Sequence, residues 1–117
     1  MERTEKPWGY ELLWAHTDKY VGKLLHIDAG HALSRQYHEV KDETILVLDG
    51  ELTLEIGDGE NTRTLILGPQ ETFHVTPGTI HRFVAVQNVD LVEVSTPELG
   101  DVVRLEDRYG REGTSEA

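Results

Sequence analysis

The chain has 117 residues, a length that suits one domain, and its 11 Lys and Arg against 22 Asp and Glu give a formal net charge of −11. Such an acidic chain repels phosphate backbones and anionic lipids, which argues against nucleic-acid and membrane partners. The sequence has no cysteine, signal-peptide segment or bilayer-length apolar run, which excludes thiolate chemistry and makes a cytoplasmic location the expectation.

Short segments in which apolar and polar residues alternate follow one another along the chain, separated by Gly, Pro, Asp or Asn. In chain order the predicted strands are 10–15, 20–27, 33–38, 43–48, 51–56, 62–67, 71–75, 81–86 and 91–95. The Asp49-Gly50 pair between two alternating segments is typical of a β-hairpin. Residues 98–111 fit either an edge strand or a short helical turn. This pattern predicts an all-β sandwich or barrel.

Four polar residues fall at strand positions that can face the inside of such a barrel. Gln36 and His38 are two residues apart on one strand, so their side chains share a face. Glu43 opens the next strand, and His81 follows Pro77-Gly78 near the start of a later one. An amide oxygen, two imidazoles and a carboxylate suit Zn²⁺, Mn²⁺, Fe²⁺, Co²⁺ or Ni²⁺. A wet polar cavity is the alternative, because burying unpartnered polar groups costs roughly 1–3 kcal/mol each.

The spacing of these residues resembles the first motif of the cupins, G-x5-H-x-H-x(3,4)-E-x6-G. Gly30, Gln36, His38, Glu43 and Gly50 fit it at every spacing, with Gln36 in place of the first His. The second cupin motif is met more loosely, by Gly78 to His81, and lacks the later Asn. The resemblance implies a double-stranded β-helix, or jelly-roll, cupin barrel over residues 1–112. The small and polar residues 113–117 at the chain end are expected to form a disordered tail. The resemblance also implies one divalent metal ion, with Zn²⁺ as the leading candidate, held by Gln36, His38, Glu43 and His81.

A narrower resemblance extends over most of the chain, to the isomerase domain of type II phosphomannose isomerases, which in two-domain members follows a GDP-mannose pyrophosphorylase domain. The segments that carry it are Lys6 to Glu11, Lys23, Gly30, Leu33 to His38, Lys41 to Glu43 and Asp101 to Arg111. The family has the same Q-x-H variant. The chain departs from it at Lys41, where the family usually has Arg, and at Thr44-Ile45, where it has His-Trp.

This resemblance implies metal-dependent aldose–ketose isomerisation of a sugar or sugar phosphate, with mannose 6-phosphate as the first substrate to test. Lys23, on the strand face of Leu25, and Glu93 are the candidate catalytic residues. Ser34, on the face of Gln36, and Arg104 are the candidate substrate-binding residues, Arg104 as a phosphate clamp. A rim lysine and a surface salt bridge are the competing interpretations of Lys23 and Arg104.

Two other functions remain compatible with the same residues. One is a metal-dependent cupin dioxygenase, which would use Fe²⁺ and consume O₂. The other is a cupin that binds a sugar or another small molecule without turnover. By analogy with cupins of this size, the chain is also expected to form a homodimer.

Overall fold

The computed structural model describes residues 1–115, and in this part of the chain the regular structure is almost entirely β. The strands are β1 (Glu2–Lys6), β2 (Gly9–His16), β3 (Val21–Ile27), β4 (Arg35–Tyr37), β5 (Glu43–Asp49), β6 (Leu52–Ile56), β7 (Arg63–Leu67), β8 (Thr72–Val75), β9 (His81–Val84), β10 (Val89–Ser95), β11 (Val102–Glu106) and β12 (Gly113–Ser115). A 3-10 turn, η1 (Gly59–Asn61), lies between β6 and β7. Within residues 1–115 there is no helix with the length and apolar character needed to cross a membrane.

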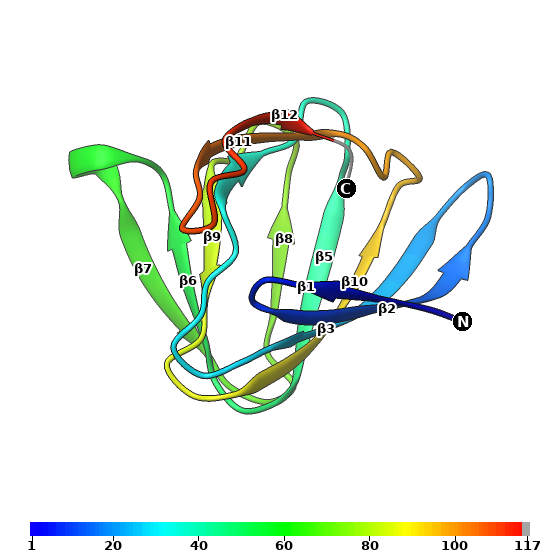
Figure 1. Cartoon of the computed structure of the whole chain (residues 1–117), viewed down its shortest axis with the longest axis horizontal. Helices are drawn as coiled ribbons and strands as arrows, with labels where there is room; N and C mark the ends of the chain where they lie inside the picture. Colours follow the sequence, from blue (N-terminus) through cyan, green and yellow to red (C-terminus); the bar gives the residue numbers. More distant parts are fainter. Residues whose placement is uncertain (116–117) are drawn as a thin grey trace.

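The strands form two antiparallel sheets of six. One sheet has the order β1-β2-β3-β10-β5-β8, and the other has the order β12-β11-β4-β9-β6-β7. The sheets face each other around the core (Figure 1). Strands that are far apart in sequence, such as β3 and β10, are neighbours, as the interleaved sheets of a jelly roll require. The predicted all-β barrel in a single domain is confirmed.

The nine predicted strands are all present, with ends that differ by a few residues. Residues 98–111, for which the sequence allowed either an edge strand or a short helical turn, contain the strand β11. The N-terminal strand β1 was not predicted because its side chains are mostly exposed and show no apolar alternation. It is held by backbone pairing with β2, from Glu2 opposite Leu13 to Lys6 opposite Gly9.

The prediction of a β-hairpin at Asp49-Gly50 is wrong. β5 pairs with β10 and β8, whereas β6 pairs with β7 and β9, so this turn carries the chain from one sheet to the other. Gly50 has a φ of 82°, and a Cβ there would lie 2.3 Å from the backbone oxygen of Asn88. The Asp-Gly pair therefore serves a close crossing between sheets, for which glycine is needed as much as in a hairpin turn.

The prediction of a disordered tail is also wrong for residues 113–115. Gly113–Ser115 forms β12, which pairs with β11 and extends that sheet by one strand. Pairing of this kind uses backbone groups, so it needs no apolar pattern in the sequence. Residues 116–117 lie outside the described residues.

Buried polar side chains interrupt the apolar inner faces of several strands. The core that surrounds them consists of Trp8, Leu25, Ile27, Ile45, Val47, Leu52, Leu54, Leu67, Phe83, Ala85, Val89 and Leu91. Each large aliphatic side chain in it contributes about 1.5–3 kcal/mol to folding. These polar residues include Lys23 on β3, Glu43 on β5, His81 on β9 and Glu93 on β10. They line adjoining cavities between the sheets, and these cavities form the candidate site.

Candidate metal centre

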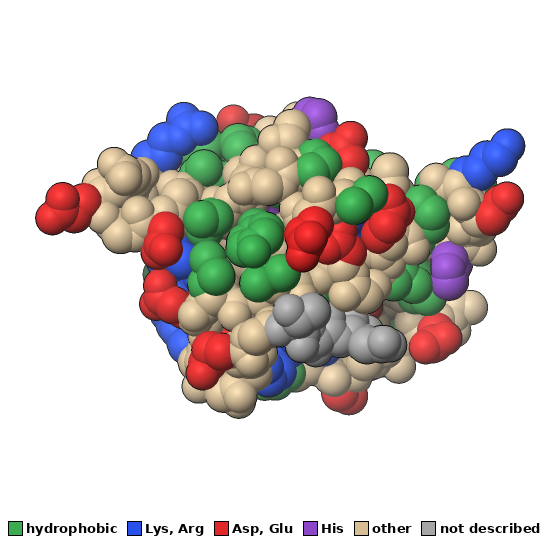
Figure 2. Space-filling view, turned by 90° about the horizontal axis from the view of Figure 1, so that it is seen from above, with side chains coloured by type: hydrophobic (Ala, Val, Ile, Leu, Met, Phe, Trp, Pro, Cys, Tyr) green, Lys and Arg blue, Asp and Glu red, His purple; other side chains and the backbone are tan. Residues whose placement is uncertain are grey.

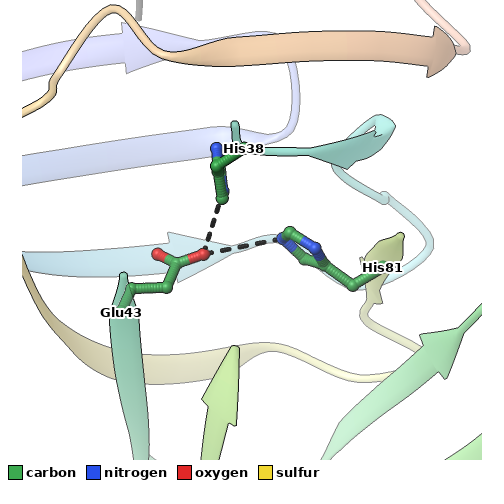
Figure 3. A group of neighbouring side chains, drawn as sticks. All are labelled: His38, Glu43 and His81. Atoms are coloured by element: carbon green, nitrogen blue, oxygen red, sulfur yellow. Dashed lines mark hydrogen bonds and ion pairs between the residues drawn. The ribbon is translucent and has the colours of Figure 1, made fainter. Parts of the chain in front are cut away.

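Three of the four predicted metal ligands converge between the two sheets. His38 directly follows β4, Glu43 opens β5 and His81 opens β9, and their side chains point toward one another (Figure 3). Glu43 Oε1 lies 3.1 Å from His38 Nε2 and 3.6 Å from His81 Nε2. One potential ligand atom from each residue falls within a group 4.8 Å across. All three side chains are buried.

Backbone carbonyls orient both imidazoles. His38 Nδ1 donates to the Asp101 oxygen at 2.6 Å, and His81 Nδ1 donates to the Thr79 oxygen at 2.9 Å. Because a carbonyl can only accept, each Nδ1 carries a proton and each Nε2 is turned toward Glu43. This is the arrangement by which proteins hold histidine ligands in one tautomer.

The resulting cluster presents acceptor atoms to one another. Burial lowers the pKa of His81 to about 4, so near neutral pH its Nε2 carries a lone pair. Burial also disfavours the charged form of Glu43, but the close contact with His38 and the charge of Lys41 outweigh it and lower the pKa of this carboxyl. Glu43 Oε2 has no hydrogen-bond partner among the described residues. Facing acceptors of this kind fit a divalent cation.

Gln36, the fourth predicted ligand, lies beside the cluster and lines the same cavity. It sits directly across from His81 in the pairing of β4 with β9. Its amide nitrogen donates to the Ser34 hydroxyl at 2.8 Å, which leaves the amide oxygen as the free end of the side chain. Ser34, a predicted substrate-binding residue, is buried and lines the same cavity. Its hydrogen bond with Gln36 places it next to a candidate ligand.

Residues 23–96, which contain the whole cluster, match the family model Cupin_2, described as "Cupin domain". The chain belongs to the cupin family. It is 34% identical over 115 residues to the mannose-1-phosphate guanylyltransferase ManC of Salmonella typhimurium strain LT2. It is 35% identical over the same length to the mannose-1-phosphate guanylyltransferase of Escherichia coli K12. Each match covers 91% of this cupin but 22% of the relative, so the chain spans about a fifth of their length.

A solved structure with the same fold is that of KdgF from Halomonas sp. It superimposes with a TM-score of 0.74 at 21% identity, covering 84% of this cupin and 89% of the KdgF chain. At this level of identity the likeness concerns the fold alone.

Lys41 is a site residue that the sequence did not single out as functional. This buried lysine lies 3.1 Å from Glu93 Oε2 and 3.6 Å from Glu43 Oε2. Burial opposes its charge, but the two carboxylates outweigh burial and raise the pKa of Lys41. Burial and the nearby Glu43 raise the pKa of Glu93. Lys41 lies two residues before Glu43, a spacing that would place both side chains on one face of a continuous strand. Because Lys41 precedes the strand, in the turn before β5, this alternation did not predict its position.

Both predicted catalytic residues line the cleft next to the cluster. Lys23 and Glu93 face each other across the β3–β10 pairing and are buried. Lys23 forms an ion pair with Glu11 of β2 at 3.0 Å, so it is not a rim lysine in water. Glu11 was missed because its inward position depends on the register of β2 against β3, which one sequence does not reveal.

The other predicted substrate-binding residue, Arg104, also lines this cleft. It is only 8% exposed and makes no salt bridge with Glu106 or Asp107, so it is not part of a surface ion pair. Arg111, which the sequence did not single out, lines the cleft beside it and is held by Asp107 at 2.9 Å.

Proposed function

We propose that this cupin is a metal-dependent aldose–ketose isomerase that acts on a sugar or sugar phosphate, with conversion of mannose 6-phosphate to fructose 6-phosphate as the first reaction to test. The observation that carries the proposal is the buried His38–Glu43–His81 cluster at the wall of a cleft. Support for the substrate class comes from the relatives, whose name refers to mannose 1-phosphate.

The proposed ligands are Gln36, His38, Glu43 and His81, and the proposed ion is a divalent metal, Zn²⁺ first, with Mn²⁺, Fe²⁺, Co²⁺ and Ni²⁺ as alternatives. Such an ion polarises a carbonyl and stabilises the negative charge that develops on its oxygen. The protein holds the two imidazoles through Asp101 and Thr79, so the ligand atoms need little rearrangement when the ion binds.

Glu93 and Lys23 are the residues proposed to act on the substrate. The Glu93 carboxylate is suited to remove the proton from C2 of the aldose; the C–H electron pair then forms the C1–C2 double bond, and the carbonyl pair moves to O1. Delivery of a proton from the Glu93 carboxyl to C1, after exchange with solvent, and transfer of the O2 hydroxyl proton to O1 complete the ketose. Lys23, paired with Glu11, is suited to donate a hydrogen bond to a substrate oxygen.

The test uses the purified full chain, stripped with a chelator and reloaded with each metal separately. We expect fructose 6-phosphate to form from mannose 6-phosphate only in a metal-loaded sample, with solvent deuterium appearing at the carbon that receives the proton. Oxygen uptake with Fe²⁺ and no isomerisation would identify a dioxygenase instead. A sugar that raises the melting temperature without any turnover would identify a binding protein. Either of these results overturns the proposal.

The homodimer, expected by analogy with the family, and the cytoplasmic location, expected from the sequence, are likewise proposals. Light scattering during size-exclusion chromatography tests the first, because a dimer has twice the mass of the chain. Fractionation of cells that express the protein tests the second.

A further inference from the structure

Two Asp-Gly pairs occur in the sequence, at Asp49-Gly50 and Asp58-Gly59. An aspartate that precedes glycine can cyclise, because the backbone nitrogen of the glycine can attack the side-chain carboxyl and no glycine side chain shields that nitrogen. The backbone must rotate to bring the two groups into a five-membered ring. The reaction therefore depends on how firmly each pair is held, and the structure holds the two pairs very differently.

Asp49-Gly50 is fixed where the chain crosses from one sheet to the other. Asp49 ends β5 and pairs with Asp90 of β10. Gly50 passes so close to Asn88 that a Cβ on it would lie 2.3 Å from the backbone oxygen of that residue. Rotation of this peptide would break the strand pairing or push Gly50 against Asn88, so the fold opposes ring closure.

Asp58-Gly59 lies in the turn between β6 and β7, outside both strands. The turn projects from the body of the barrel at the upper left of the view (Figure 1). Figure 2 shows the molecule from above, and the same end again stands clear at the left. The Asp58 side chain is 52% exposed, and a Cβ added to Gly59 would meet no atom of the described chain within 4 Å. This pair therefore has room to rotate.

The two groups that would react are already in contact at this turn. Asp58 Oδ1 accepts a hydrogen bond from the Gly59 N–H at 3.0 Å, so the side chain is folded back over the nitrogen that would attack it. The other backbone bonds of the turn are long, at 3.2 Å from Asn61 to Asp58 and 3.3 Å from Thr62 to Gly59. Exposed bonds of this kind are readily replaced by water, so they hold the turn weakly.

We propose that Asp58 is a site of spontaneous covalent modification, at which aspartate is converted to isoaspartate through a cyclic imide. The Gly59 nitrogen forms a bond to Cγ of Asp58, and one carboxyl oxygen leaves as water with the N–H proton and the carboxyl proton. A water molecule then adds to one of the two ring carbonyls and breaks its bond to the nitrogen. Opening at the backbone carbonyl of Asp58 gives isoaspartate, in which the main chain runs through Cβ and Cγ. Water is the only other reactant.

The modification changes the turn and leaves the barrel in place. Isoaspartate has the same charge as aspartate, but it adds one methylene to the main chain and removes the side chain that caps Gly59. Asp58 lies 4.0 Å from Arg35. That arginine keeps its closer partners, Glu55 and Glu106, at 2.6 and 2.9 Å. The modified chain should therefore stay folded, with its metal centre intact.

Incubation of the folded full chain in heavy-oxygen water measures the reaction at both pairs in one sample. Each ring opening adds one heavy oxygen atom to the peptide that contains the aspartate. Digestion in ordinary water, followed by liquid chromatography and mass spectrometry, then separates isoaspartate from aspartate. We expect Asp58 to react roughly 10- to 100-fold faster than Asp49, because backbone distortion opposes ring closure at Asp49 alone. In urea, where the fold holds neither pair, the two should react at similar rates.

Three variants complete the design. Asp58→Asn forms the same ring with release of ammonia, and it should react faster because an uncharged amide accepts a nucleophile more readily than a carboxylate does. Asp58→Glu keeps the charge but needs a six-membered ring, so the reaction at this position should fall to background. Asp49→Asn should remain slow in the folded chain and become fast in urea, because the fold and not the side chain protects that pair.

Three results would overturn the inference. The first is reaction at Asp49 as fast as at Asp58 in the folded chain. The second is the absence of isoaspartate at Asp58 of the folded chain, which would show that the turn is rigid. The third is an undiminished preference for Asp58 in urea, which would assign the preference to the neighbouring residues and not to the fold. None of these measurements depends on isomerase activity or on bound metal.

Discussion

Asp101 connects the loop before β11 to the turn at residues 39–41, next to the candidate metal centre. The number of its hydrogen bonds predicts how much unfolding free energy is lost when it is replaced. Its carboxylate accepts backbone N–H bonds from Glu39, Val40 and Lys41 at 3.0, 2.7 and 2.8 Å. Asp101→Ala removes all three acceptor contacts from a partly exposed position. At about 1 kcal/mol each, with some replacement by water, the loss should be about 2–4 kcal/mol of unfolding free energy. The backbone oxygen that holds His38 is retained in this variant.

Urea denaturation at pH 7, with no metal added, measures this loss. Asp18→Ala is the matched control, because Asp18 is exposed and its side chain makes no hydrogen bond within the described residues. We expect the control to stay within about 0.5 kcal/mol of wild type. A loss below 1 kcal/mol in Asp101→Ala would refute the reasoning, because three such bonds would then contribute almost nothing.

The same residue predicts a pH dependence with a definite sign. Burial opposes ionisation of Asp101, but the three N–H donors outweigh it and lower its pKa from the ordinary value of 3.8. Its stabilisation is therefore complete above the unfolded pKa and is lost as the pH falls through the lower folded value. The stability difference between wild type and Asp101→Ala should be constant between about pH 5 and 7 and shrink below about pH 4. A difference that grows on acidification would contradict this sign.

The remaining predictions concern the ligands, the sheet crossing and the buried lysine. His81→Ala should reduce metal content by elemental analysis from one ion per chain to near zero, whereas the exposed His74→Ala should retain the metal; full occupancy in His81→Ala would exclude it as a ligand. Gly50→Ala should lose at least about 2 kcal/mol in urea denaturation, because its Cβ would meet the Asn88 oxygen at a positive φ, and wild-type stability would show that the crossing adjusts freely. Lys41→Met should lose about 3–5 kcal/mol, because it leaves two buried carboxylates without their cation, and a small loss in the same assay would mean that water takes its place.

Much of the candidate site could be predicted because it depends on local spacing. Gln36 and His38 share a face through strand alternation, and the distance to Glu43 matches a family motif. Alternation with Leu25 likewise placed Lys23 inside the barrel. The two alternations lie within single strands and the motif lies within one short continuous stretch, so these relations hold however the sheets are ordered.

The features that the sequence did not reveal depend on which strands become neighbours. The pairing of Lys23 with Glu11 needs the register of β2 against β3, and the alignment of Arg104 with Gln36 needs β11 beside β4. The Asp49-Gly50 turn has the same local chemistry in a hairpin and in a crossing between sheets. Only the later pairing of β5 with β10 decides between them.

The interleaved strand order also has a consequence for how the protein reaches its native state. β3 pairs with β10, and the ligand His81 enters from a segment about forty residues after His38. Topologies built from such distant contacts fold slowly, because the chain loses the entropy of closing long loops before the stabilising contacts can form. The His38–Glu43–His81 cluster is therefore assembled only after both halves of the chain have come together. Metal uptake during refolding should report this late step, and metal added early should not accelerate the steps that precede it.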